Sequence, residues 1–158
     1  DYMRRSGEEW KDYTPVMHPL TEDHTIVRTD VLPKLLELLS HNKHHAMPQR
    51  IFEVGDVVVN MENRLRLAAC STHAKANFSE VRSYVQSLMR ELDVKWDVKE
   101  SDDEAFIEGR RGDIFINGRK VGVFGEIHPE VLENFQLGYP VVAFELDVSS
   151  IFDVGELL

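Results

Sequence analysis

The chain has 158 residues, and its 28 Asp and Glu side chains against 18 Lys and Arg give a formal net charge of −10 at pH 7. This length predicts one domain that buries roughly 70% of the surface of the unfolded chain. No apolar run approaches the ~20 residues of a membrane span, no secretory signal is recognisable, and the single cysteine, Cys70, excludes an internal disulfide. We therefore predict a cytoplasmic protein with Cys70 in its core, and the acidic balance disfavours phosphate-bearing partners for the chain as a whole.

The beginning of the chain predicts an irregular segment and then a helix. Residues 1–20 show neither a helical nor a strand period, and one domain is predicted over residues 21–158. Because the chain opens without Met, we expect it to be a piece of a longer protein. The apolar residues from 31 onward fall on one helical face, with Asp30 as the predicted N-cap and Pro33 in the first turn. This helix is expected to end near Asn42.

The middle of the chain predicts a hairpin and a second helix. Residues 50–59 and 64–69 are rich in Val, Ile and Phe, which favours strands, and the polar residues 60–63 predict the turn between them. Asn77 and Glu80 resemble a capping box. They are followed by one apolar helical stripe that is expected to face the core, formed by Phe78, Val81, Val85, Leu88 and Leu92.

The last third predicts further strands and a short helix. Apolar and charged residues alternate from Val94 to Lys99, which is typical of a half-buried strand. Asn117 and Gly118 predict a two-residue type I′ turn, and Pro129 suits the first turn of a helix. The remaining strands are predicted at 113–116, 120–127 and 141–146. Together these elements predict an α+β domain, an antiparallel sheet flanked by helices.

Two glycines, Gly122 and Gly125, lie inside the predicted strand 120–127, where glycine normally weakens a strand. They indicate either a β-bulge or a close approach of another backbone or of a ligand. The bulge is the favoured alternative.

Three polar clusters are candidate binding sites. The histidine-rich segment 41–45 has no further ligand at usable spacing, so a solvated cluster is favoured over a metal site. The acidic run 102–104 could hold Mg²⁺, but such runs are usually exposed loops. Arg110 and Arg111 could contact nucleic-acid phosphate or a carboxylate on a neighbouring chain, and an exposed surface pair is favoured. We predict no metal site.

Four segments resemble the β subunit of the phenylalanyl-tRNA synthetase family over about residues 20–152: TEDHTIVRTDVLPKLL (21–36), RIFEVGDVVV (50–59), GRKVGVFGEIHPEVL (118–132) and GYPVVAFELDVSSI (138–151). More narrowly, the chain resembles that subunit's C-terminal catalytic-like module, a degenerate copy of the class II synthetase fold, in its archaeal or eukaryotic form. The resemblance implies a larger enzyme of two α and two β chains that uses ATP and Mg²⁺. It implies that the α subunit forms phenylalanyl-adenylate and charges tRNA(Phe). The module would be a scaffold that meets tRNA(Phe) only through the whole enzyme.

The resemblance also implies that this copy has lost the chemistry. Adenylate formation needs cations at the ATP phosphates and polar groups around the amino acid. The α subunit carries an arginine where this chain has Val59 and a second arginine where it has Asp147. It carries two glycines where this chain has Val142 and Phe144, and a histidine and a serine where it has Asp30 and Leu32. No catalytic residue and no cofactor are therefore expected in this chain. We expect Leu32 to fill the amino acid pocket, and Val142 and Phe144 to occupy the space that ATP needs.

Three functions remain open at this stage. A noncatalytic module of a ligase is ranked first, a free adenylate-forming enzyme second, and an unrelated small-molecule-binding α+β domain third. The second requires a cation from elsewhere in the chain to reach the degenerate site. The third gains support only if residues 122–125 border a filled pocket.

Overall fold

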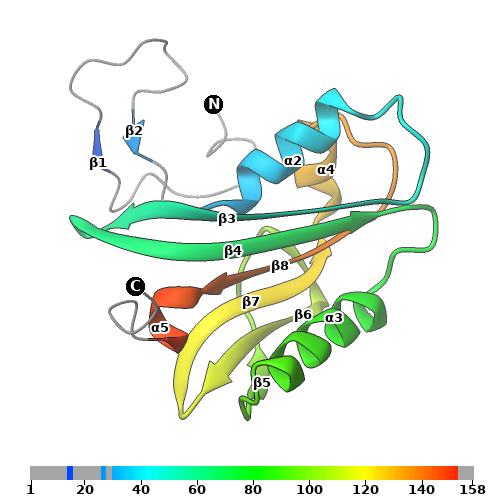
Figure 1. Ribbon diagram of the computed structural model, residues 1–158. Coiled ribbons are helices and arrows are strands. Elements are labelled where there is room, and N and C mark those ends of the chain that lie inside the picture. Colours follow the sequence, from blue (N-terminus) through cyan, green and yellow to red (C-terminus); the bar gives the residue numbers. More distant parts are fainter. Residues whose placement is uncertain (1–13, 16–25, 28–29, 153–158) are drawn as a thin grey trace.

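The computed structural model describes residues 14–15, 26–27 and 30–152. Its centre is a six-stranded antiparallel sheet in the order β3-β4-β8-β7-β6-β5, with helices on both faces (Figure 1). The sheet strands are β3 (Gln49–Val59), β4 (Glu62–Thr72), β5 (Asp97–Glu100), β6 (Phe106–Ile116), β7 (Arg119–Ile127) and β8 (Val141–Asp147). The other elements are α2 (Leu32–His41), α3 (Phe78–Glu91), α4 (Pro129–Asn134), α5 (Val148–Ile151) and a short ladder of β1 (Thr14–Pro15) with β2 (Ile26–Val27). The predicted α+β class is confirmed.

Both predicted hairpins form, because each turn carries residues that tolerate positive φ. Asn117 and Gly118 have φ angles of 51° and 75° between β6 and β7, as the type I′ prediction requires. The β3–β4 turn is tighter than predicted, since only Asn60 and Met61 lie outside the strands, with φ angles of 50° and 67°. Its closing pair is Val59 with Glu62.

Strand β8 lies in the middle of the sheet between β4 and β7, and every residue in it except Asp147 is buried. Side chains alternate between the two faces of a strand, so β8 contributes to two separate cores. Val141 and Ala143 join the cluster under α2 and α4, whereas Val142 and Phe144 join the cluster under α3.

The start of α2 differs from the prediction. The helix begins at Leu32, and its N-cap residue Val31 makes no side-chain cap hydrogen bond. Asp30 is not the cap, because its carboxylate pairs with Arg66 of β4 instead. The first backbone N–H groups of the helix donate to Glu145 of β8, a residue distant in sequence. This side chain performs the role that was assigned to Asp30.

Helix α3 begins as predicted, with Asn77 Oδ1 accepting from the Glu80 backbone N–H at 3.0 Å. The Glu80 carboxylate bonds to His73 and Tyr84, so the observed interaction is a simple N-cap. The buried stripe is centred differently from the prediction. Val81 and Val85 are buried as expected, but Met89 completes the stripe, and Leu88 and Leu92 are half-buried at its edge.

Strand β5 is shorter than predicted, because Val94 and Trp96 precede it. Both side chains still pack against the core under α3, where Trp96 contacts Phe124 edge to face with ring centroids 6.2 Å apart. Val98 lies within β5 on the edge of the sheet and is exposed.

Both alternatives proposed for the strand glycines hold. Gly125 pairs with Arg111 and Gly122 with Ile114, and the β6–β7 register shifts beside each of these pairs, as in a β-bulge. The backbone approach is also close. A Cβ on Gly122 would lie 2.3 Å from the Glu145 carbonyl oxygen, and a Cβ on Gly125 would lie 2.5 Å from the Arg110 carbonyl oxygen.

Three further predictions concern single features. Cys70 is buried, as predicted, and burial raises the pKa of its thiol to about 12. The predicted boundary between residues 20 and 21 lies outside the described residues. Within the described part of the chain, no helix has both the length and the apolar character needed to cross a membrane.

Candidate functional site

A cavity of about 300 Å³ lies between the N-terminus of α2 and strands β4, β7 and β8. Four carboxyl groups and two cations are among its lining residues. The lining consists of Asp30, Leu32, Arg66, Asp103, Ala105, Phe106, Lys120, Val121, Gly122, Val123, Glu145 and Asp147. Three predicted site positions, Asp30, Leu32 and Asp147, lie in this lining, and its polar groups decide what it can bind.

Glu145 is the most deeply buried charged group of the cavity, with 5% of its surface exposed. Its two carboxyl oxygens accept from the backbone N–H groups of Val31 and Leu32, each at 2.9 Å. This places a carboxylate at the positive end of the α2 dipole. Burial, followed by the charge of Asp30, raises the pKa of Glu145 from 4.5 to about 7.

Two arginines of β4 neutralise the remaining carboxylates on this side. Arg66 Nη1 bonds to Asp30 and lies 3.6 Å from Glu145 Oε1. Arg64 Nε donates to Asp147 Oδ2 at 2.7 Å, and Ser150 Oγ donates to the same oxygen at 3.0 Å. The acid–base network therefore holds α2, β4, β8 and α5 together.

The opposite wall of the cavity has its own pairing. Lys120 Nζ lies 3.2 Å from Asp113 Oδ1. Asp103 Oδ1 accepts from the Ala105 backbone N–H at 3.0 Å, and burial raises the pKa of Asp103. Each lining cation thus faces a carboxylate already present in the protein.

Stability should depend on pH through Glu145. Its folded pKa lies above the unfolded value, so the folded state binds a proton more tightly, and stability should fall as pH rises from about 4.5 to about 7. The loss from this group should be about 3 kcal/mol. Urea unfolding of the protein and of Glu145→Gln at several pH values provides the measurement. The difference between the two free energies of unfolding should change over this window, and two parallel curves would contradict the assignment.

The six predicted site positions do not form one site. Asp30, Leu32 and Asp147 line the cavity. Val142 and Phe144 do not, because the strand alternation directs them to the α3 face, opposite Asp147. The expectation that they occupy the space needed by ATP therefore stays a prediction, separate from this cavity.

The other two predicted positions, Val59 and Leu32, differ in how they lie relative to the cavity. Val59 is half-buried against the cluster under α2 and does not line the cavity. Leu32 is buried, but the cavity stays open beside it. Gly122 and Val123 border the cavity, so the first part of the condition set for small-molecule binding holds, and the binding itself stays a prediction.

Sequence reasoning missed Arg66 and Glu145, which organise the cavity. The sequence did carry a signal for Glu145, since it is the single carboxylate inside the apolar run 141–146. An ionisable residue in a buried strand needs a specific partner. The alternation of Arg64 and Arg66 along β4 was the matching signal.

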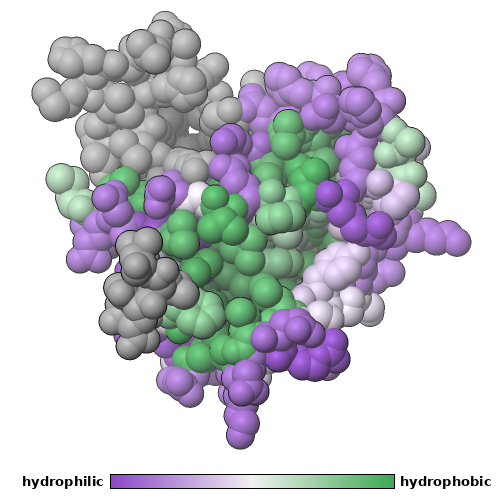
Figure 2. Space-filling model, in the orientation of Figure 1, coloured by the Kyte–Doolittle hydropathy of each residue, from purple (hydrophilic) through white to green (hydrophobic). Residues whose placement is uncertain are grey.

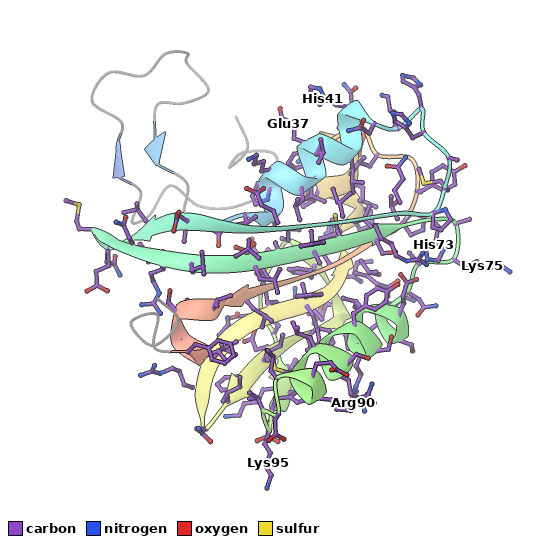
Figure 3. The ribbon with its side chains drawn as sticks, in the orientation of Figure 1. Glu37, His41, His73, Lys75, Arg90 and Lys95 are labelled. Atoms are coloured by element: carbon purple, nitrogen blue, oxygen red, sulfur yellow. The ribbon has the colours of Figure 1, made fainter. Side chains whose placement is uncertain are left out.

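The other predicted clusters show no metal site in the described residues. His41 lies 3.8 Å from Glu37, and Figure 3 shows this pair near the end of α2, whereas His73 lies after β4. Arg110 is exposed and pairs with Glu126 at 3.4 Å. Arg111 is not an exposed surface residue, because its guanidinium donates to three backbone carbonyls, those of Ser101, Asp103 and Phe106.

Comparisons with known proteins agree on one family. The family described as "Phenylalanyl tRNA synthetase beta chain CLM domain" matches residues 1–148. A phenylalanine–tRNA ligase beta subunit of Archaeoglobus fulgidus is 72% identical over 156 residues, which are 99% of this chain and 28% of that protein. The same subunit of Methanococcoides burtonii is 56% identical over 149 residues, 94% of this chain and 27% of the relative. The chain thus spans less than a third of the length of each of these relatives.

Proposed function

This chain belongs to the phenylalanyl-tRNA synthetase beta chain family, and from that premise we propose that it is a noncatalytic scaffold module of the β subunit. The module supports an α subunit that ligates phenylalanine to tRNA(Phe) with ATP and Mg²⁺ in the cytoplasm. We propose that its antiparallel sheet is a catalytic-like module of the class II synthetase fold in which the catalytic residues have been replaced. It contacts tRNA only as part of the whole enzyme.

The pairing of charges in the cavity carries the noncatalytic part of the proposal. ATP needs free cations opposite its phosphates. The two lining cations, Arg66 and Lys120, already face Asp30 and Asp113, and the lining has more carboxyl groups than cations. A triphosphate would therefore meet net negative charge and would have to break existing ion pairs.

A second function, the binding of a small molecule, is favoured by the cavity itself. It has a volume of about 300 Å³ and is lined by both apolar and charged side chains, as small-molecule sites are. A free adenylate-forming enzyme has weaker support, because Val59 supplies no cation.

The test uses a hybrid in which this chain replaces the matched segment of the Archaeoglobus fulgidus β subunit. Together with the α subunit of that organism, the hybrid should assemble and charge tRNA with phenylalanine, because the exchanged segments are 72% identical. The chain alone should give no binding heat with ATP and Mg²⁺ or with phenylalanine. A hybrid that fails to assemble would contradict the scaffold role. Heat with phenylalanine alone would favour small-molecule binding, and heat with ATP would favour the enzyme.

A further inference from the structure

On the sheet face beside α3, apolar side chains of β3 are exposed within the described part of the chain. Register places Phe52 next to Ala69, which pairs in turn with Phe144 of β8, and it places Val54 next to Leu67. We call these five residues the open face. Phe52 and Val54 are 74% and 52% exposed, although neither lies in a loop. Figure 2 shows a continuous hydrophobic area on this side of the molecule.

An exposed surface of this kind differs from scattered apolar residues. Large contiguous apolar patches on soluble proteins mark interaction sites, and permanent interfaces resemble a protein core cut in half. The open face continues the buried cluster under α3, to which Phe144 belongs and against which Leu67 and Ala69 pack. A groove of about 210 Å³ between Phe52 and Tyr84 extends this surface. The core under α3 is therefore incomplete at its β3 side.

The dimensions favour one α-helix as the occupant. Helix α3 packs mainly on β7 and β8, although Tyr84 accepts a hydrogen bond from Arg50 of β3, and α5 contacts β4 near Leu65. The exposed part of this face is the middle of β3 and the adjacent part of β4. Two strands at roughly 4.8 Å spacing present a strip about 10 Å wide, which is close to the diameter of a helix with its side chains. A second copy of the sheet cannot approach the strip face to face, because α3 stands about 10 Å above it.

We propose that the open face binds an amphipathic helix from another part of the same β subunit, which lies alongside α3 with its apolar side chains on Phe52 and Val54. This inference rests on the proposed function for the identity of the subunit. The match covers only 28% of the Archaeoglobus fulgidus subunit, so most of such a polypeptide lies outside the matched part. A tethered segment has an effective concentration in the millimolar range, which favours it over any free partner.

The test measures access to position 52. Phe52→Cys is prepared in this chain and in the hybrid with the Archaeoglobus fulgidus β subunit, and alkylation of the new thiol is followed by peptide mass spectrometry. Cys70 is buried and serves as an internal reference for unfolding. We expect rapid alkylation in the isolated chain and at least about tenfold slower alkylation in the hybrid without the α subunit, because a packed helix covers the side chain. Equal rates would overturn the proposal, and so would protection that arises only when the α subunit is added.

A pair of lysine substitutions adds a second readout. Phe52→Lys should leave the melting temperature of the isolated chain unchanged and should lower that of the hybrid by about 5 °C, since it places a charge in an apolar contact. Leu38→Lys is the matched control, because Leu38 is also an exposed apolar residue, 47% exposed, but lies on α2. Equal effects of the two substitutions in the hybrid would contradict the proposal. Both measurements are made without tRNA or ATP, so their failure is distinct from a failure of the charging test.

Discussion

Replacing Gly122 by Ala is expected to destabilise the fold by about 3 kcal/mol. The new Cβ would lie 2.3 Å from the carbonyl oxygen of Glu145 and 2.7 Å from Leu146 Cδ2. The first of these atoms belongs to the backbone of the central strand β8 and cannot rotate away. Strand β7 must therefore move away from β8, which weakens the ladder at the wall of the cavity.

Gly138→Ala is the matched control for this prediction. A Cβ on Gly138 would have no atom within 4 Å, so this substitution should change stability by less than about 0.5 kcal/mol. Urea unfolding monitored through tryptophan fluorescence measures both variants. If Gly122→Ala were as stable as Gly138→Ala, the close approach of β7 to β8 would be wrong.

The hairpins and α3 could be predicted from sequence because their signals are local. Asn117 and Gly118 specify a turn by their own φ preferences, and Asn77 caps α3 through a contact three residues away. The two strand glycines carried a correct local signal as well. For the turns and the cap, the residues that determine the structure are neighbours in the chain, whereas the glycines mark contacts with distant residues that the sequence alone does not name.

The cavity could not be predicted in this way, because its contacts join distant segments. Glu145 accepts from Val31, which is 114 positions away, and Arg64 contacts Asp147 across 83 positions. Local propensity favoured Asp30 as the cap of α2, but Arg66 on the neighbouring strand competes for that carboxylate. Such competition becomes visible only once the order of the strands is known.

The separation of Val142 and Phe144 from the cavity follows from the strand period. The period of two along β8 already separates even from odd positions, so these two residues could not share a face with Asp147. The prediction grouped them by resemblance to a motif and did not apply the alternation. When a motif match lies within one strand, the alternation of side chains between the two faces should therefore be checked before its residues are assigned to a common site.

The double variant Val59→Arg, Asp147→Arg is expected to lose stability and to gain no adenylate chemistry. Asp147 accepts from Arg64 and Ser150, and breaking a partly buried ion pair of this kind costs about 3 kcal/mol. An arginine at position 147 would also face Arg64 and Arg66, its register partner on β4. Val59→Arg should contribute less, because Val59 is only half-buried near the end of the β3–β4 hairpin.

Restoring these two cations leaves the remaining obstacles to ATP in place. Asp30, Asp103 and Glu145 still line the cavity, and Arg66 stays paired with Asp30. Phenylalanine-dependent pyrophosphate exchange should therefore remain at background, and ATP with Mg²⁺ should not raise the melting temperature of the variant. Asp147→Asn is the control, because it removes the charge without adding a cation and should destabilise less than Asp147→Arg. Measurable exchange, or stabilisation by ATP, would mean that the site lacks only charge, and the scaffold role would have to be replaced by that of a dormant enzyme.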